Sequence, residues 1–290
     1  MNIWALLYFT AFLFYLYSGI YVLKLNRKSM INVLFFVMCI SLSAWSLGYS
    51  FSTGARDIQE AMAWRRISTF GWTFFYSNLL LFIAAITKSK LSPETFKYSF
   101  GLYVPSAVFF LRFLNHDTGN YVDSPFGWVY LLYYKGLWSY AFDIFYLICV
   151  VSAFTLLFIW KYKTDSLRER KQVQIIIVSM LGAFLGGGLT DTLLPIVGVK
   201  VLPLGILFSA IAIMGMWVAI TKYKMMNLTQ EIAAEHVLVT MKDPVIVLDP
   251  QYRIGQVNKA TLEITGFQHQ ELVGEGLKNI IPKFEKNHII

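Results

Sequence analysis

Long apolar stretches alternate with short polar ones over the first 221 or so residues of the chain. A helix needs about 20 apolar residues to cross a hydrocarbon core about 30 Å thick. Seven stretches reach or approach that length. The fourth is the shortest and contains Pro105 and Arg112, whose side chain can snorkel outward from the helix end. The pattern predicts an all-α membrane domain of seven transmembrane helices, at residues 3–23, 31–51, 67–86, 98–114, 137–160, 173–194 and 202–221.

Lysine and arginine gather in alternate connections between these predicted helices. Cytoplasmic loops of membrane proteins carry an excess of both residues, so the richer set marks the cytoplasmic side. The richer set is Lys24, Arg27, Lys28, Lys88, Lys90, Lys97, Lys161, Lys163, Arg168, Arg170, Lys171, Lys222 and Lys224, and the poorer set is Arg56, Arg65, Arg66, Arg112, Lys135 and Lys200. We therefore expect a multi-pass protein of the cell membrane, with its N-terminus outside and its C-terminus in the cytoplasm.

The composition agrees with a lipid environment and narrows the partners. Charged residues make up 14% of the chain, against about 25% in soluble domains. The net charge of +8 would suggest nucleic acid for a soluble protein, but here loop lysines and arginines account for it, and no nucleic-acid partner is expected. Cys39 and Cys149 both lie in apolar stretches, so neither a disulfide framework nor a metal site is predicted.

No arrangement of residues in the sequence indicates catalysis. The metalloprotease and nucleophile-elbow motifs do not occur, and the last predicted span lacks the lysine that a retinal Schiff base would need. The histidines are not at metal-ligand spacing: His116, His236, His269 and His288. We expect no enzyme activity within this chain, and no cofactor.

Charged residues inside the spans are the first candidates for a ligand site, because burying charge in a membrane is costly. Asp143 and Asp191 lie in the fifth and sixth spans and should face the bundle interior, toward Arg65, Arg66 or Arg112. An ion pair that only holds helices together is the alternative.

The longest outer loop, residues 115–136, adds further candidates. Its run of β-forming residues predicts an extended segment or hairpin over the outer mouth, serving either as a functional loop or as a structural lid. The candidate ligand-binding residues are Trp64, Arg65, Arg66, Asp123, Trp128, Asp143 and Asp191.

The pattern changes after the last span. A polar helical stretch at residues 224–241 carries Ile232 and Val239 at helical spacing and, with Lys222, is expected to form a signal linker and a dimer contact. Strands are predicted at 244–248 and 253–257, followed by a helix at 259–265 between an Asn258 cap and Gly266, and by a second short helix at 270–273.

This order resembles the opening half of a PAS domain. The resemblance is carried by Asp243, Asp249, Asn258, Ala260, Gly266, Glu271, Leu272 and Gly274. A PAS fold needs a further helix and three more strands, and the sequence ends at Ile290. We therefore expect residues 242–290 to be a partial α+β segment that is truncated, vestigial or completed by a partner.

The membrane part resembles the N-terminal seven-helix region of bacterial sensor histidine kinases. The matching motifs are Trp64-Arg65-Arg66-Ile67, Leu189-Thr190-Asp191-Thr192-Leu193-Leu194-Pro195, Pro203-Leu204-Gly205 and Ala219-Ile220-Thr221-Lys222-Tyr223. In that family the region precedes PAS, kinase or cyclic-di-GMP synthase modules. Val237, not an acidic residue, follows His236, so kinase activity is not carried over to this chain.

The resemblance implies a sensory module of a two-component signalling protein. Residues 1–223 would be the sensor domain, 224–241 the linker and 242–290 the PAS-like part. A homodimer, an unidentified small ligand or peptide, and a cytoplasmic signalling domain or protein would be its partners. A small membrane transporter or channel, with Asp143 and Asp191 binding a cation or substrate, is the alternative function.

Overall fold

The computed structural model describes residues 2–89, 99–115, 120–131, 136–194, 197, 199, 201–222, 240–249 and 252–276. The chain divides into two compact units, Met1–Met225 and Met226–Ile290. Each unit is described by itself below.

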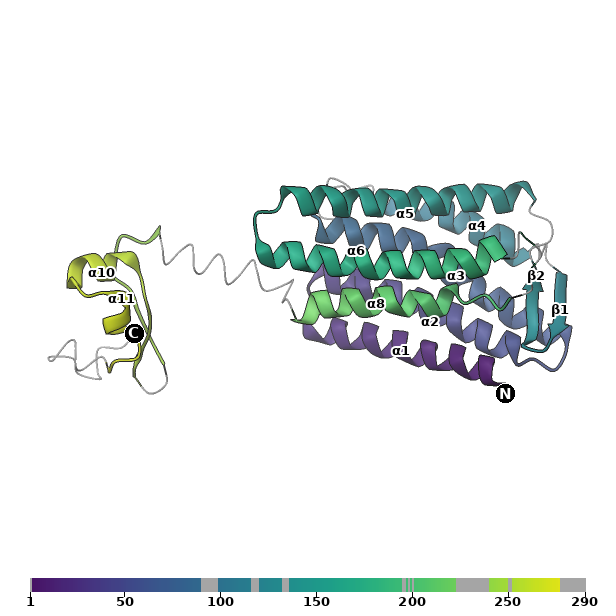
Figure 1. Cartoon of the computed structure of the whole chain (residues 1–290), viewed down its shortest axis with the longest axis horizontal. Helices are drawn as coiled ribbons and strands as arrows, with labels where there is room; N and C mark the ends of the chain where they lie inside the picture. The colour runs from purple at the N-terminus through teal and green to yellow at the C-terminus, as the bar shows by residue number, and fades with distance from the viewer. Residues whose placement is uncertain are drawn as a thin grey trace. The chain divides into compact units, whose positions relative to one another are not determined.

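The first unit is a seven-helix bundle whose helices run side by side along one direction (Figure 1). Six of the described helices are long and apolar enough to cross a membrane, and α4 is a seventh, shorter apolar helix. The helices are α1 (Ile3–Leu25), α2 (Met30–Thr53), α3 (Ile58–Ile86), α4 (Tyr103–Asn115), α5 (Leu137–Lys163), α6 (Leu167–Gly188) and α8 (Gly205–Lys222). A 3₁₀ turn, η1 (Ser99–Leu102), precedes α4, and a π-helical turn, η2 (Leu189–Leu193), continues α6.

Two helices begin earlier than their hydropathy predicts. Helix α3 begins at Ile58 rather than at residue 67, because the Asp57 side chain accepts the backbone amide of Glu60 at 2.8 Å and starts a polar turn. Helix α6 begins at Leu167 rather than at residue 173, with Ser166 as its cap. In both cases the added turns carry charged residues, which a hydropathy window excludes.

The predicted fourth span is too long. Helix α4 has 13 residues, which at 1.5 Å per residue is about 20 Å, and the chain from Ser99 to Leu102 forms the 3₁₀ turn. Pro105 is tolerated because it lies in the first turn of α4, where backbone amides have no partner within the helix. Residue 98, the predicted start, lies outside the described residues.

Helices α2 and α3 pack backbone to backbone through two glycines. A Cβ on Gly71 would lie 2.4 Å from both the carbonyl oxygen of Ser41 and the amide nitrogen of Trp45. A Cβ on Gly48 would lie 2.7 Å from the carbonyl oxygen of Trp64. Small residues permit such contacts between helices in a membrane.

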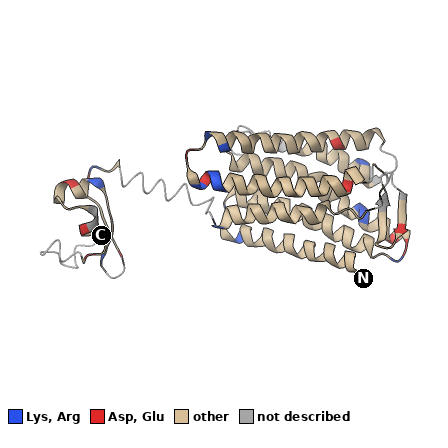
Figure 2. Ribbon diagram, in the orientation of Figure 1, with Lys and Arg blue, Asp and Glu red and all other residues tan. Residues whose placement is uncertain are grey.

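Buried polar side chains then tie the helices together. Asn78 Nδ2 donates to Ser41 Oγ at 2.7 Å, and the Tyr103 hydroxyl donates to Asn78 Oδ1 at 2.6 Å. These bonds connect α2, α3 and α4. Figure 2 shows the charged residues of this unit lying toward the ends of the helices, with uncharged residues between.

The hairpin expected within residues 115–136 is present. Strands β1 (Asn120–Ser124) and β2 (Gly127–Leu131) pair antiparallel, with Ser124 opposite Gly127. The tip is fixed to the bundle because Asn2 Nδ2 donates to the carbonyl of Phe126 at 2.8 Å, and Trp4 packs edge-on against the Phe126 ring. We call the end of the bundle that carries this strand pair the hairpin end (Figure 1).

The second unit contains the predicted strand, turn, strand and helix. Strand β3 (Ile246–Leu248) pairs antiparallel with β4 (Ile254–Val257), and α10 (Lys259–Thr265) and α11 (His269–Leu272) follow. Gly266, at a φ of +73°, ends α10 as expected. A small apolar cluster joins both strands to both helices: Ile246, Leu248, Ile254, Val257, Leu262 and Leu272.

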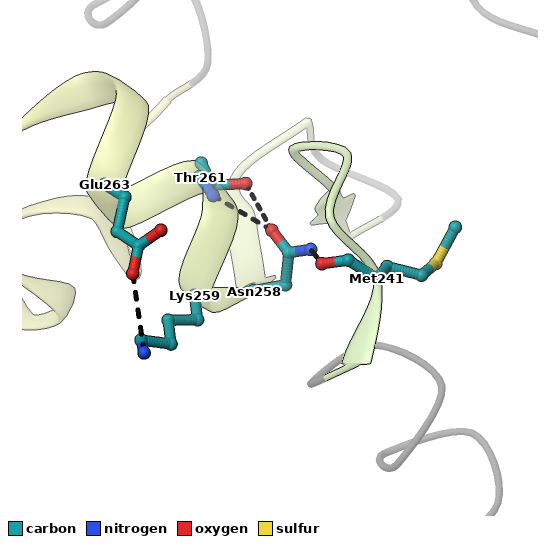
Figure 3. Close-up of polar contacts among 5 residues, drawn as sticks. All are labelled: Met241, Asn258, Lys259, Thr261 and Glu263. Atoms are coloured by element: carbon teal, nitrogen blue, oxygen red, sulfur yellow. Dashed lines mark hydrogen bonds and ion pairs between the residues drawn. The ribbon is translucent and has the colours of Figure 1, made fainter.

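Asn258 organises this unit from the start of α10 (Figure 3). Its Oδ1 accepts the backbone amides of Val245 at 2.9 Å and Thr261 at 3.0 Å. Its Nδ2 donates to the carbonyls of Asp243 at 2.8 Å and Met241 at 3.4 Å. One side chain therefore caps the helix and holds the chain that enters β3.

Candidate functional site

A cavity of about 280 Å³ lies within the helix bundle. Its walls come from α2, α3, α4, α5, η2, α6 and α8. Its volume is near the lower end of the range for pockets that hold small organic ligands. The wall is mostly apolar and aromatic, and among the described lining residues four carry a formal charge: Arg65, Arg66, Asp143 and Asp191.

One face of α3 supplies the first wall. Arg65, Thr69, Trp72, Tyr76 and Leu79 all line the cavity. They are spaced by three or four residues, which places them on one side of a helix. Since α3 begins at Ile58, Arg65 lies two turns inside the helix near the hairpin end, and the aromatic residues lie deeper.

One face of α5 supplies a second wall. Ser139, Asp143, Tyr146, Val150 and Phe154 line the cavity at helical spacing. Helix α5 begins at Leu137, so Asp143 lies in its second turn.

Aromatic rings from these walls contact one another. The ring centroids of Tyr76 and Tyr146 lie 4.7 Å apart, and those of Trp72 and Phe142 lie 4.8 Å apart at 81°. Both separations are typical of favourable aromatic pairs. Phe184 of α6 continues the set beside Tyr146, at 6.1 Å.

Asp191 lines the cavity from the π-helical turn η2 and also holds the start of α8. Its carboxylate accepts the backbone amide of Gly205, at 3.0 and 3.2 Å, and the hydroxyl of Thr190, at 2.8 Å. Gly205 is the first residue of α8, where a negative group is favoured by the free amides and the helix dipole. Asp191 therefore joins the end of the sixth helix to the beginning of the last.

Arg65 lines the same cavity as Asp191 and packs on an aromatic ring. Its guanidinium lies over the Tyr49 ring, 4.3 Å from the ring centroid. Arg112, another expected partner of the aspartates, instead lies over Trp138, 5.7 Å from that ring's centroid. Arg65 therefore brings a positive charge, packed on a ring of α2, to the cavity that both aspartates line.

The hairpin borders a second, smaller cavity of about 20 Å³ beside the first. Trp128 and Val129 of β2 line it together with Arg65, Tyr49 and Pro203. Tyr49, Arg65 and Pro203 line both cavities. The hairpin therefore lies beside residues that also form part of the main cavity wall.

The seven predicted site residues fall into three groups. Arg65, Arg66, Asp143 and Asp191 come together in the main cavity, and Trp128 borders the smaller one. Trp64 lines neither of these two cavities; it stacks on Phe51, with ring centroids 4.4 Å apart. Asp123 is exposed on β1, opposite Trp128 in the hairpin register, and also lines neither.

Of the three predicted linker residues, the structure describes one. Lys222 is the last residue of α8, and Ile232 and Val239 lie outside the described residues. Among the described residues no three His, Cys, Asp or Glu side chains come together as a metal site would require.

The sequence does not single out the aromatic wall. Tyr49, Tyr76, Phe142 and Tyr146 resemble other apolar residues of the predicted spans, and Trp72 is expected to pack between helices. A partial signal is present, because Thr69, Trp72 and Tyr76 follow Arg65, and Tyr146 follows Asp143, at helical spacing.

The sequence matches one known family over residues 7–229. That family is the N-terminal 7TM region of histidine kinases. No curated protein matches the sequence. The family match covers the bundle from residue 7 onward, including every described residue that lines the cavity, and the region it describes is a membrane sensory module, not a catalytic domain. With its seven-helix bundle, this chain belongs to the family of N-terminal 7TM regions of histidine kinases.

Proposed function

We propose that a small extracellular or membrane-dissolved ligand binds in the main cavity, and that the bundle passes this event to the cytoplasmic segment after α8. The main support for the proposal is that Asp191 both belongs to the cavity wall and holds the start of α8. Its carboxylate lines the cavity and accepts the amide of Gly205, the first residue of α8. A ligand that interacts with Asp191 therefore acts on the helix that ends at Lys222.

The energies are of a suitable size. A ligand shifts a conformational equilibrium only by its difference in affinity for the two states, and coupling between sites is typically about 1–3 kcal/mol. One hydrogen bond to a charged group contributes about 1.5–3 kcal/mol. Gain or loss of the contact between Asp191 and Gly205 is enough for such coupling. The π-helical turn supports this view, because π turns within helices are frequent at functional sites.

The proposed orientation places the hairpin end outside the cell and Lys222 at the cytoplasmic surface. The distribution of lysine and arginine between alternate connections supports it. In this orientation Arg65, Asp143 and Asp191 occupy the outer half of the membrane, where a ligand from outside reaches them first.

The proposed relay runs from the sensor, residues 1–223, through the linker, 224–241, to a PAS-like segment, 242–290. The paired strands, the Asn258-capped helix and the Gly266 stop support the PAS-like assignment. The proposal includes a homodimer that meets through Ile232 and Val239, and a cytoplasmic signalling domain or protein as the recipient. It assigns no catalytic step to this chain.

A cavity-filling substitution tests the relay without a known ligand. Ala183 and Leu185 both lie on α6, but Ala183 lines the cavity and Leu185 is 65% exposed on the outside of the bundle. We expect Ala183→Phe to imitate an occupied cavity and Leu185→Phe to leave it unchanged. Hydrogen exchange of residues 222–249, measured on the full chain in lipid nanodiscs, should change at least about twofold in the first variant only.

Two outcomes would contradict the proposal. One is an identical exchange pattern in both variants when both are folded and inserted. The other is robust solute uptake by proteoliposomes containing the chain, which would favour the transporter alternative.

A further inference from the structure

We infer that the cavity takes a small zwitterion, a molecule whose ammonium and carboxylate groups lie close together on an aromatic body. The inference rests on the proposed function, since it names the ligand class of the same cavity. Three features of the lining lead to it: its charge balance, the position of the charges and the chemistry of the remaining wall.

The charges of the lining are balanced. Two arginines and two aspartates are the formally charged residues among the described lining. A charge taken from water into such a site is costly unless it is paired. A ligand with one net charge would leave the site unbalanced, whereas a zwitterion brings one partner for each sign.

The two signs also lie at the same end of the cavity. Arg65 and Arg66 line it from the third turn of α3, Asp143 from the second turn of α5, and Asp191 from η2, where its carboxylate holds the first residue of α8. The rings of Tyr76 and Tyr146, 4.7 Å apart, lie farther along the same faces of α3 and α5. Charges grouped in this way fit a ligand whose own charges are one or two bonds apart, as in an α-amino acid, rather than a long molecule charged at both ends.

Each ligand group then has a matching partner. A guanidinium binds a carboxylate through two parallel hydrogen bonds, which assigns the carboxylate to Arg65 with Arg66. An ammonium group gains from a carboxylate and from the faces of aromatic rings, which assigns it to Asp143 with Tyr76 and Tyr146. A ligand carboxylate on Arg65 competes with Asp191, so binding reaches the contact that holds Gly205.

The rest of the wall suits an aromatic body. Trp72 and Phe142 already pair edge to face, and Tyr146 lies beside Phe184. A further ring can join such a set at the same spacing, and a volume of about 280 Å³ holds a single small molecule of this kind.

Four probes that share one ring separate the possible head groups. They are phenylalanine, with both charges; 2-phenylethylamine, with the cation only; 3-phenylpropanoate, with the anion only; and 2-phenylethanol, with neither. Calorimetric titration of the full chain in nanodiscs should give phenylalanine an affinity at least about tenfold higher than that of any other probe.

Two substitutions should then separate the contributions of the ammonium group and the carboxylate to the preference for phenylalanine. Asp143→Asn should weaken phenylalanine and phenylethylamine about tenfold and leave phenylpropanoate unchanged. Arg65→Gln should weaken phenylalanine and phenylpropanoate and leave phenylethylamine unchanged. If Arg65→Gln fails to fold, Arg66→Gln tests the same anion partner from an exposed position. Asp123→Asn, on the hairpin and outside both cavities, serves as the control and should leave all four probes unchanged.

The inference is overturned if a probe with one charge or none binds as tightly as phenylalanine, or if phenylalanine shows no saturable binding. Neither result contradicts the proposed relay, because hydrogen exchange in the Ala183→Phe variant tests the relay independently of the ligand. Conversely, phenylalanine binding without any change in exchange at residues 222–249 would retain the ligand class and contradict the relay.

Discussion

At the scale of single residues, the contact between Asp191 and Gly205 is unusually sensitive to one methyl group. A Cβ added to Gly205 would lie 2.3 Å from Asp191 Oδ2, closer than real Cβ contacts allow. The carboxylate would have to move and would then leave the Gly205 amide without its acceptor. Position 205 therefore favours glycine, because the Asp191 carboxylate occupies the space that a Cβ would need.

We expect Gly205→Ala to lower the free energy of unfolding by about 1–3 kcal/mol, the usual cost of a buried donor that loses its partner. Gly188→Ala is the matched control, because a Cβ there meets nothing within 4 Å, and alanine favours a helix by up to about 1 kcal/mol. Thermal unfolding of both variants in the same detergent measures the difference. Equal midpoints would show that Asp191 does not depend on this contact.

A second prediction at this scale concerns Asn258. Asn258→Ala removes the cap of α10 and the acceptor of the Val245 amide, so we expect a loss of about 2–3 kcal/mol in local stability. Hydrogen exchange at Val245 and Thr261 in the full chain should rise accordingly.

The neighbouring Lys259 provides the control for Asn258. It pairs with Glu263 at 3.4 Å, and the two side chains are 77% and 65% exposed. Such a surface pair contributes about 0.5 kcal/mol or less, so Lys259→Ala should leave the exchange nearly unchanged. An equal rise in both variants would mean that the assigned role of Asn258 is wrong.

At the scale of helices and strands, the tight packing of α2 on α3 gives the next prediction. A Cβ on Gly71 would press on backbone atoms of Ser41 and Trp45 at 2.4 Å, and backbone cannot rotate away as a side chain can. Gly71→Ala should therefore separate the two helices and destabilise the bundle by about 1–3 kcal/mol. Gly182→Ala is the control, since its Cβ would meet only Ile211, at an ordinary 3.9 Å.

Thermal unfolding should separate these two glycine variants, with the lower midpoint for Gly71→Ala. The same midpoint for both would show that α2 and α3 can move apart without cost.

Whether a helix or turn can be predicted from the sequence depends on the residues that it buries. Apolar length predicts every long helix, because lipid imposes that length on all of them. It misses the first turns of α3, which follow Arg56 and the cap Asp57 and contain Glu60, because a polar turn has no hydropathy signal. It also cannot predict η2, since a π-helical turn depends on how Asp191 meets another helix.

The residues of the candidate site also divide into those that the sequence predicts and those that it does not. Asp143 and Asp191 could be predicted because charge within a membrane segment needs an explanation, and Arg65 because it precedes the third predicted span and can serve as their positive partner. Tyr76 and Tyr146 could not, because an aromatic residue in a span is compatible with lipid, with packing or with a cavity wall. Only the three-dimensional arrangement distinguishes these three environments.

At the scale of the whole molecule, the orientation in the membrane is the property most open to direct test. Asp123 on the hairpin and Asp165 between α5 and α6 are both exposed, and the native Cys39 and Cys149 are buried. We expect Asp123→Cys to react with a membrane-impermeant maleimide on intact cells, and Asp165→Cys to react only after permeabilisation. The reverse pattern would invert the proposed topology.

The aromatic wall of the cavity also gives the protein an optical property. Of the eight tryptophans in the chain, Trp45 and Trp72 line the cavity, so a molecule bound there as proposed would lie beside indole rings and change their emission. Subtracting the spectrum of a Trp72→Phe variant isolates the contribution of that one ring. Ligands for the proposed site can therefore be screened in chemical libraries through the protein's own fluorescence, with no dye, tag or downstream readout attached.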